Sequence, residues 1–311
     1  MKKYKFLFIF LLSGLILPAC FLAGNGQQQE ESADSITSVH YEFDILITAK
    51  DSLFFEEFVS SIDIEKIKKQ ELSDIITQVA LYFDGAPYVA HTLEICDVES
   101  LVVNLREFDC TTFAENVLAL TLMMKNGDPS LSVFIENLKM LRYRDNFLSG
   151  YPSRLHYFTD WLYNNEQKGI VDIVSNDFGN RNFRAYVNYM TQNFEKYPAL
   201  SRDSSFVKEM SVIEEEVSGY DFKLVTGDYI SAITDLIQNG DIIAFSTNIE
   251  GLDVVHLGFG YFVDEKLHFI HASTNGNRVR VSEKTLDQYV NEKSYIDGIL
   301  VARPKEDFLS K

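Results

Sequence analysis

Cysteines and basic residues are scarce in this 311-residue sequence. Its three cysteines, Cys20, Cys96 and Cys110, form no CxxC pair and no Cys/His cluster with zinc-site spacing, so we expect no bound metal and no cofactor. Lys and Arg number 28 against 46 Asp and Glu, and the formal net charge is −18. A chain this acidic repels nucleic acid, and no basic stripe with interleaved aromatic residues offsets the repulsion. We therefore expect no nucleic-acid partner. We also expect the protein to be a monomer.

The sequence also lacks an internal repeat, a GxGxxG motif and a P-loop. Helical periodicity dominates its first two thirds, whereas apolar strands dominate its end. The predicted helices cover residues 54–61, 72–83, 113–125, 130–142, 155–166, 183–192, 201–216 and 228–237. Helices gathered in one part of the chain and consecutive strands in another indicate an α+β fold rather than alternating βαβ units.

A long hydrophobic run occurs only at the start of the chain. Residues 1–5 are basic, and the apolar residues 6–17 are too few to cross a bilayer core of about 30 Å. Residues 17–20, Leu-Pro-Ala-Cys, resemble a lipobox. We expect residues 1–19 to be a lipoprotein signal peptide and Cys20 to be diacylated after cleavage, which would anchor the protein to a membrane of the bacterial cell envelope, on its periplasmic or surface face. An ordinary cleaved signal peptide is the alternative.

The most informative motif places Cys110 at the start of an amphipathic helix, directly after an apolar strand. Residues 100–105 are typical of a buried strand, and apolar residues recur at helical spacing from Phe113 to Met124. Free backbone N–H groups and the helix dipole favour an anion at this position, so we predict that the pKa of the Cys110 thiol falls from about 8.5 toward neutrality. The residue would then be a nucleophile; the alternative is a small buried hydrophobic side chain.

Three of the six histidines lie on consecutive predicted strands near the end of the chain. These strands cover residues 239–245, 254–261 and 266–273, and side chains alternate between the two faces of each. A buried imidazole needs a hydrogen-bond partner, which a thiol or a second imidazole on a neighbouring strand can supply. We predict that His256 is a general base, that His271 orients it, and that His268 points the other way, to the surface.

Four short motifs carry a family resemblance: Asp109-Cys110-Thr111-Thr112, Gly-Asp-Ile-Ile-Ala-Phe at 240–245, His-Leu-Gly-Phe-Gly-Tyr at 256–261, and Phe-Ile-His-Ala-Ser at 269–273. They are similar to motifs of the NlpC-type, papain-related cell-wall hydrolases. Residues 142–144 and 151–161 resemble a narrower family within that superfamily, the N-acetylmuramoyl-L-alanine amidase-like family, formerly a domain of unknown function. The likeness extends from about Ser73 to Pro304.

The resemblance implies a papain-like (NlpC-type) fold, in which the nucleophile helix packs on an antiparallel sheet beside an enlarged helical lobe. Residues 20–39 would be a flexible tether, and residues 40–311 a single catalytic domain with a helical insertion at about 126–238. The resemblance implies the same three catalytic residues: Cys110, His256 and His271. The backbone N–H of Cys110 and one further donor, for which Tyr88 is a candidate, would stabilise the oxyanion.

The implied substrate is peptidoglycan or a muropeptide, cut at the amide between the lactyl group of N-acetylmuramic acid and L-Ala. The alternatives are a γ-D-glutamyl endopeptidase, which would use the same three residues, and a non-catalytic muropeptide-binding lipoprotein. Pure binding would not need a thiol with a lowered pKa. The long segment between Cys110 and His256 makes peptide specificity difficult to transfer from the smallest members of the superfamily.

Several polar residues are candidates for substrate binding. Ser153, Arg154, His156 and Tyr157 match the narrower family as a block, and Arg154 suits the carboxylate that stem peptides carry at D-Glu. Asp109 would cap the helix, receive a substrate amine, or both. Thr111 occupies the position after the nucleophile, where NlpC-type enzymes usually have Ser. The remaining expectations concern structural residues: Arg142 and Arg144 in solvated surface ion pairs with Asp145, Asp160 or nearby glutamates, and Cys96 unbridged and partly buried on a strand at residues 92–96.

Overall fold

The computed structural model describes residues 43–306, and the predicted signal peptide, Cys20 and the tether lie outside this range. Its strands are β1 (Ile45–Ile47), β2 (Leu101–Val103), β3 (Val171–Asp172), β4 (Arg181–Phe183), β5 (Phe222–Thr226), β6 (Ile242–Thr247), β7 (Val254–Val263), β8 (Lys266–Ser273), β9 (Arg278–Val281) and β10 (Ile296–Pro304). The main sheet has the order β4-β5-β10-β6-β7-β8-β9 with β3 beside β10, and its strand pairs are antiparallel. β1 and β2 form a separate parallel pair.

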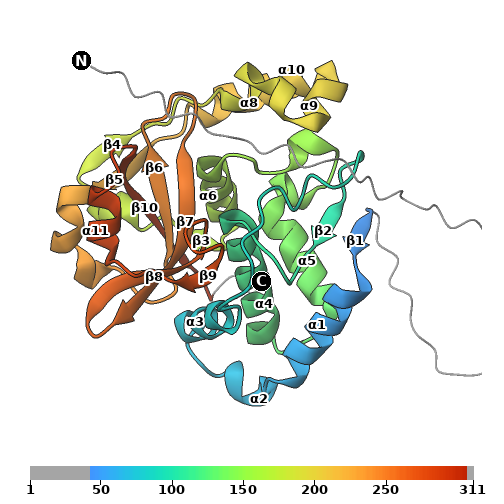
Figure 1. Cartoon of the computed structure of the whole chain (residues 1–311), viewed down its shortest axis with the longest axis vertical. Helices are drawn as coiled ribbons and strands as arrows, with labels where there is room; N and C mark the ends of the chain where they lie inside the picture. The colour runs from blue at the N-terminus through green and yellow to red at the C-terminus, as the bar shows by residue number, and fades with distance from the viewer. Residues whose placement is uncertain (1–42, 307–311) are drawn as a thin grey trace, which may run out of the picture. The chain divides into compact units, whose positions relative to one another are not determined.

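Helices flank this sheet (Figure 1). The α-helices are α1 (Ala49–Ser60), α2 (Ile64–Ile67), α3 (Leu72–Tyr82), α4 (Cys110–Asn126), α5 (Leu131–Arg142), α6 (Phe158–Gln167), α7 (Ser175–Phe178), α8 (Tyr189–Gln192), α9 (Pro198–Arg202), α10 (Ser204–Val217) and α11 (Leu286–Asn291). Short 3-10 helices are η1 (Arg144–Asn146), η2 (Tyr151–Ser153), η3 (Phe194–Lys196), η4 (Gly227–Ala232) and η5 (Thr234–Leu236). The mixed α+β class predicted from the sequence is confirmed.

The two faces of the sheet are covered by different helices. Ala244 and Phe259 belong to the core that α3, α4 and α5 complete on one face. Phe245 and Phe269 belong to a second core, which α11 and η4 complete on the other face. Successive strand residues thus alternate between the two cores, as the pleat requires. In Figure 1, α4 and α11 accordingly lie on opposite sides of the strands.

The helices α8, α9 and α10 form a small lobe with its own apolar core, built around Met190, Leu200 and Met210. Tyr151 and Tyr157, which precede α6, belong to this same core. The lobe lies at the top of Figure 1, beyond the ends of β6 and β7. The lobe therefore lies near the first residues of β7.

Helix prediction was accurate where an apolar stripe was long, and wrong in several places where tertiary contacts override local preference. The expected helix at 228–237 consists of the 3-10 helices η4 and η5, and the expected helix at 201–216 is interrupted at Asp203, between α9 and α10. Residues 183–192 were expected to be one helix, but Phe183 ends β4, opposite Phe222 of β5, and only residues 189–192 are α-helical. The expected helix at 155–166 begins at Phe158, because Leu155 donates its backbone N–H to the carbonyl of Arg142. Residues 92–96 form a turn and a loop rather than a strand.

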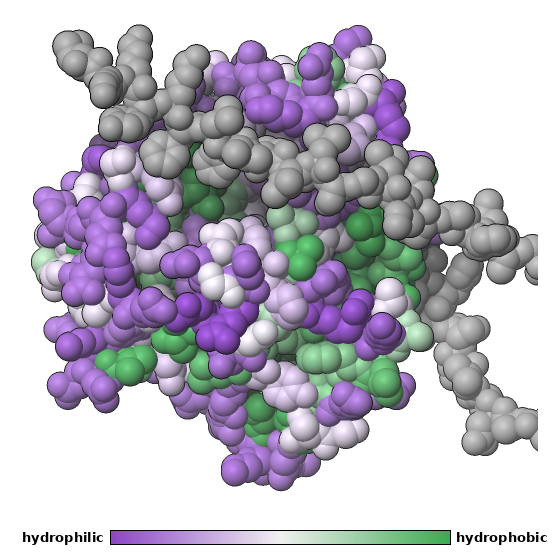
Figure 2. All heavy atoms as spheres, viewed as in Figure 1, coloured by the Kyte–Doolittle hydropathy of each residue, from purple (hydrophilic) through white to green (hydrophobic). Residues whose placement is uncertain are grey.

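Hydrophilic residues cover most of the molecular face in Figure 2, and hydrophobic residues form smaller groups between them. Within residues 43–306, no helix combines the length and the apolar composition that crossing a bilayer requires. Cys96 is half-buried, and it is not bonded to Cys110.

Candidate active site

Cys110 is the first residue of α4, and a capping box determines where this helix begins. The Asp109 carboxylate accepts the backbone N–H of Thr112 at 2.8 Å, and the Thr112 hydroxyl accepts the backbone N–H of Asp109 at 3.0 Å. Both donors would otherwise lack a partner at the helix start. Asp109 thus has the capping role that was one of the two roles expected for it.

The structure contradicts the expected reactivity of the free thiol. Burial raises the pKa of the Cys110 thiol to about 12, and the nearby charge of Asp109 adds to this increase. Hydrogen bonds from the backbone N–H of Leu257 and from Thr111 act in the opposite direction, but they are weaker than the burial. The prediction of a thiolate was wrong because the helix start is desolvated. A neutral thiol needs a base to act as a nucleophile, and Leu257 directly follows His256.

His256 of β7 and His271 of β8 contact each other, with His256 Nε2 2.6 Å from His271 Nδ1. Burial lowers the pKa of His256 to about 4, and the charge of Lys293 lowers it further. Burial also lowers the pKa of His271, to about 2. Both rings are therefore neutral near pH 7, and a single proton lies between the two facing nitrogens. The Nδ1 atom of His256 remains available to another group.

Two backbone features place these rings together. The pairing of β6 with β7 is irregular between Phe245 and Ser246, where a bulge lies directly beside His256. Gly258 allows the close approach of β8, because a Cβ atom at this position would lie 2.6 Å from the Ile270 carbonyl oxygen and 3.0 Å from the His271 Cβ. The small residue on the His256 face thus makes room for His271 itself.

The third strand histidine, His268, is half-buried rather than exposed. Its Nδ1 atom lies 2.9 Å from the carbonyl oxygen of Ser282, and it is not among the residues that line the cavities described below. The prediction that it takes no part beside His271 agrees with this placement, whereas the prediction of a surface position was only partly right.

A cavity of about 510 Å³ brings most of the predicted residues together. Cys110 and His256 line it, and so do five of the seven predicted substrate-binding residues: Asp109, Thr111, Arg154, His156 and Tyr157. Ser153 is not among the lining residues, because its hydroxyl donates to the carbonyl of Gly150 and accepts the N–H of Ser149 within a turn.

Tyr88 is not among the lining residues of that cavity either, although its main chain lies beside the residues that precede Cys110. It pairs with Phe108 in an isolated bridge two residues before Cys110. Burial raises the pKa of Tyr88 to about 12, and the charges of Cys110 and Asp109 contribute to this shift. Its hydroxyl therefore keeps its proton near pH 7 and is able to donate a hydrogen bond.

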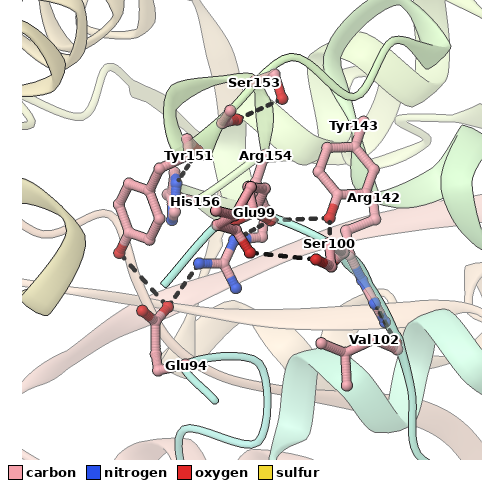
Figure 3. Close-up of polar contacts among 12 residues, drawn as sticks. Glu94, Glu99, Ser100, Val102, Arg142, Tyr143, Tyr151, Ser153, Arg154 and His156 are labelled. Carbon is pink, nitrogen blue, oxygen red and sulfur yellow. Dashed lines mark hydrogen bonds and ion pairs between the residues drawn. The ribbon is translucent and has the colours of Figure 1, made fainter. Parts of the chain in front are cut away.

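Arg154 is held by two glutamates in the structure (Figure 3). Its guanidinium lies 2.5 Å from Glu94 and 3.4 Å from Glu99, and the group stacks on the Tyr151 ring at 4.9 Å. Glu99 also accepts the Tyr143 hydroxyl at 2.8 Å. The positive charge of Arg154 is thus already compensated on the cavity wall, which weakens the expectation that it receives a substrate carboxylate.

The solvated surface pairs expected for Arg142 and Arg144 are instead wholly or partly buried. Arg142 is 1% exposed, and it binds Glu115 at 2.7 Å and the Val102 carbonyl at 2.7 Å. Arg144 binds the buried Asp160 at 2.5 Å. Sequence spacing cannot show this burial, because Glu115 lies on α4 and Val102 on β2, far from α5 in the chain.

His156 and Tyr157 are both engaged with the protein. His156 Nε2 lies 2.8 Å from the Tyr151 carbonyl oxygen, and burial lowers the pKa of its ring well below the usual value. The Tyr157 hydroxyl donates to Glu214 at 2.7 Å and accepts the Met190 N–H at 3.0 Å. Tyr157 therefore joins the cavity wall to the lobe of α8 and α10.

Sequence reasoning missed three residues of the site. Asp253 lines the cavity and accepts the backbone N–H of Thr159 at 2.7 Å, which supports the first turn of α6. The Tyr289 ring lies 6.3 Å from that of His256, and Lys293 lies over Tyr289. Asp253 could have been found from its position three residues before His256, whereas Tyr289 and Lys293 give no local signal. Within residues 43–306, no three His, Cys, Asp or Glu side chains are grouped to hold a metal ion.

Comparison with known proteins gives a family for this arrangement. A family model described as N-acetylmuramoyl-L-alanine amidase-like (AmiA-like) matches residues 78–299. The crystal structure of an N-acetylmuramoyl-L-alanine amidase from Bacteroides uniformis is 36% identical, with a TM-score of 0.73 over 76% of this chain and 100% of that chain. A Bacteroides fragilis protein whose name suggests a xylanase is also 36% identical, with a TM-score of 0.70 over 73% of this chain and 99% of its own.

A Legionella pneumophila protein shares the fold alone, at 21% identity and a TM-score of 0.61 over 82% of this chain and 96% of its own. No curated protein sequence matches the chain.

Proposed function

This chain belongs to the N-acetylmuramoyl-L-alanine amidase-like family, and from this premise we propose that it is a cysteine hydrolase of peptidoglycan with a papain-like, NlpC-type fold. Its reaction would be cleavage of the amide between the lactyl group of N-acetylmuramic acid and L-Ala. The observation that carries the proposal is the His256–His271 contact on the wall of a cavity that Cys110 also lines. A nucleophile, a base and a group that orients the base are what acyl transfer requires.

The pKa values lead to a neutral starting state. His271 Nδ1 accepts the proton on His256 Nε2, so His256 Nδ1 carries a lone pair and takes the proton of the Cys110 thiol. The sulfur then attacks the carbonyl carbon, and the backbone N–H of Cys110 with the Tyr88 hydroxyl stabilises the oxyanion. His256 returns its proton to the L-Ala nitrogen as the C–N bond breaks. Water hydrolyses the resulting thioester, and His256 acts again as the base.

The cavity offers contacts for the sugar side of the substrate. Its wall includes Tyr151, Tyr157 and Tyr197, and sugar rings commonly pack on aromatic faces. Asp109, Thr111, Arg154 and His156 provide polar atoms around this space. Ser153 would act through the turn that precedes Arg154 rather than through direct contact. We propose no cofactor and no metal for the reaction.

Digestion of purified muropeptides, followed by mass spectrometry, tests the proposal. The wild type is expected to release the sugar and an intact peptide that begins with L-Ala, and Cys110→Ala is expected to abolish release. Cys96→Ala is the matched control, because Cys96 does not line the 510 Å³ cavity. Two peptide fragments would indicate the endopeptidase, and binding without cleavage would indicate the muropeptide-binding protein. Full turnover by Cys110→Ala would refute the nucleophile.

We also propose a membrane-anchored location in the cell envelope, with Cys20 as the lipidated residue. The proposal rests on the lipobox-like residues 17–20. Labelling of growing cells with radioactive palmitate is expected to mark the wild type and not Cys20→Ala. Labelling of both proteins, or of neither, would contradict it.

A further inference from the structure

A second cavity, of about 320 Å³, lies beside the histidine pair. His256, His271 and Tyr289 line it, and His256 also lines the 510 Å³ cavity. A substrate amide held at His256 would therefore have a cavity on each side, one for the sugar part and one for the peptide part. Tyr289 belongs to α11, which covers the face of the sheet opposite to α4 (Figure 1).

The second cavity is cationic, although the chain is strongly acidic. Arg280, Lys284 and Lys293 line it. Glu283 binds Arg280 at 2.5 Å, and Glu292 pairs with Lys284, so carboxylates already compensate both of these charges.

Lys293 differs from the other two cations. Among the described residues, no carboxylate oxygen lies within ion-pair distance of its ammonium group. The Nζ atom lies 3.3 Å from the centre of the Tyr289 ring and donates to the Tyr289 carbonyl at 3.4 Å. Glu292, the preceding residue, acts on this ammonium group only from beyond ion-pair distance, so the arrangement holds a charge without an ion-pair partner beside the base. The charge lowers the pKa of His256 and so makes it a weaker base, a cost that a bound anion would reduce.

We propose that the second cavity holds the leaving stem peptide, and that Lys293 binds the free α-carboxylate of its second residue, D-Glu. The inference rests on the proposed amidase function. The second residue has a free α-carboxylate because it is linked through its side chain. Two residues of extended chain span about 7 Å. This length is similar to the 6.3 Å between the ring centres of His256 and Tyr289, and the Lys293 ammonium group lies over the Tyr289 ring. Arg154, whose charge Glu94 and Glu99 compensate, is less suited to this role.

Two substrates of equal size test the inference. N-acetylmuramoyl-L-Ala-D-Glu has the α-carboxylate, and N-acetylmuramoyl-L-Ala-D-isoglutamine has a neutral amide in its place. The wild type is expected to favour the acid by about tenfold in kcat/KM, as for a hydrogen bond between charged groups. Lys293→Met is expected to remove the preference while it still cleaves the amide substrate. Lys293→Gln, which keeps a polar end, is expected to do the same.

Lys284→Met is the matched control and is expected to retain the preference, because Glu292 already compensates Lys284. Equal turnover of both substrates by the wild type, or a preference that survives in both Lys293 variants, would overturn the inference and leave the amidase proposal standing. Failure of the wild type to cleave either substrate would overturn both. Loss of the preference in Lys284→Met as well would show a general field of the cavity and would refute the assignment to Lys293.

Discussion

Substitution of Gly258 by Ala tests how the strand spacing holds the histidine pair together. The added Cβ atom would lie 2.6 Å from the Ile270 carbonyl oxygen, 3.0 Å from the His271 Cβ and 3.1 Å from a ring carbon of Phe269. Real Cβ atoms essentially never approach a backbone oxygen this closely. The oxygen belongs to the β7–β8 pair, so relief of the clash must move β8 and His271 away from His256.

The expected size of the effect follows from two opposing contributions. Overpacking in a well-packed core costs about 1–3 kcal/mol, whereas Ala in a strand is favoured over Gly by about 0.5–1 kcal/mol. We expect a net loss of about 1–2 kcal/mol in the free energy of unfolding. The effect on catalysis is expected to be larger, because displacement of a catalytic group by about 1 Å costs about 100-fold in rate. The 2.6 Å contact between the two rings leaves little tolerance for such movement.

Urea unfolding and the kcat for muropeptide cleavage measure the two effects. Gly260→Ala is the matched control on the same strand, because its nearest atom would be the Gln238 carbonyl oxygen at 3.1 Å and no histidine atom is among its closest neighbours. We expect the control to keep kcat within about threefold. Wild-type kcat in Gly258→Ala would refute the argument that the spacing of β7 and β8 positions His271.

Four further predictions concern the buried ion pair of Arg142, the low pKa of His256 and the helix start. Arg142→Met leaves the buried Glu115 carboxylate without its ion-pair partner, so it is expected to lower the free energy of unfolding, measured in urea, by about 3–5 kcal/mol. Addition of Glu115→Leu is expected to restore stability. A loss below about 1 kcal/mol in the single variant would contradict this prediction. The pKa of His256 is about 4 in the folded protein and about 6.5 in the unfolded chain, so the neutral imidazole persists as the pH falls. The acid limb of the kcat/KM profile is therefore expected near pH 4. An acid limb at about pH 6–7 would contradict a buried neutral base. Because the unfolded chain binds this proton at a higher pH than the folded protein does, the free energy of unfolding is expected to decrease as the pH falls from about 6.5 to about 4. Urea titrations measure this decrease, which is expected to be smaller in His256→Asn. Asp109→Ala is expected to lower the stability measured by thermal unfolding by about 1 kcal/mol, because the cap of α4 is lost. Asp109→Asn is expected to lower it much less, since Asn also caps helices. Equal losses in the two variants would indicate that the charge of Asp109, rather than its capping hydrogen bond, stabilises the helix.

Much of the fold follows from patterns within short segments. The apolar stripe of α4 and the Asp109–Thr112 capping box lie within one stretch of chain, so the start of this helix was predictable to within a few residues. The positions of β7 and β8 were predictable because apolar runs with period two flank a turn. β1, β3, β4, β5, β9 and β10 were not predicted. β4 and β10, for example, pair with strands that are distant in the sequence.

The candidate site divides in the same way. Alternation along the strands predicted that His256 and His271 could meet, and the structure places their nitrogens in contact. The charge states could not be predicted, because the Cys110 pKa depends on how much water the packed lobe and sheet exclude. Whether an arginine meets solvent or a buried glutamate likewise depends on which helices pack together, as Arg142 and Glu115 show.

Local sequence determined which residues are the candidates for reaction: a cysteine after a capping acid at a helix start, and two histidines on adjoining strands. Such features depend on hydrogen bonds and periodicities within a few residues, and these are already present in an isolated segment. Tertiary structure decided how those residues are charged and what surrounds them: a neutral thiol, a histidine with a low pKa, arginines in ion pairs, and Lys293, which has no ion-pair partner among the described residues. Desolvation and ion pairing depend on distances between distant segments, and only the packed chain sets these distances.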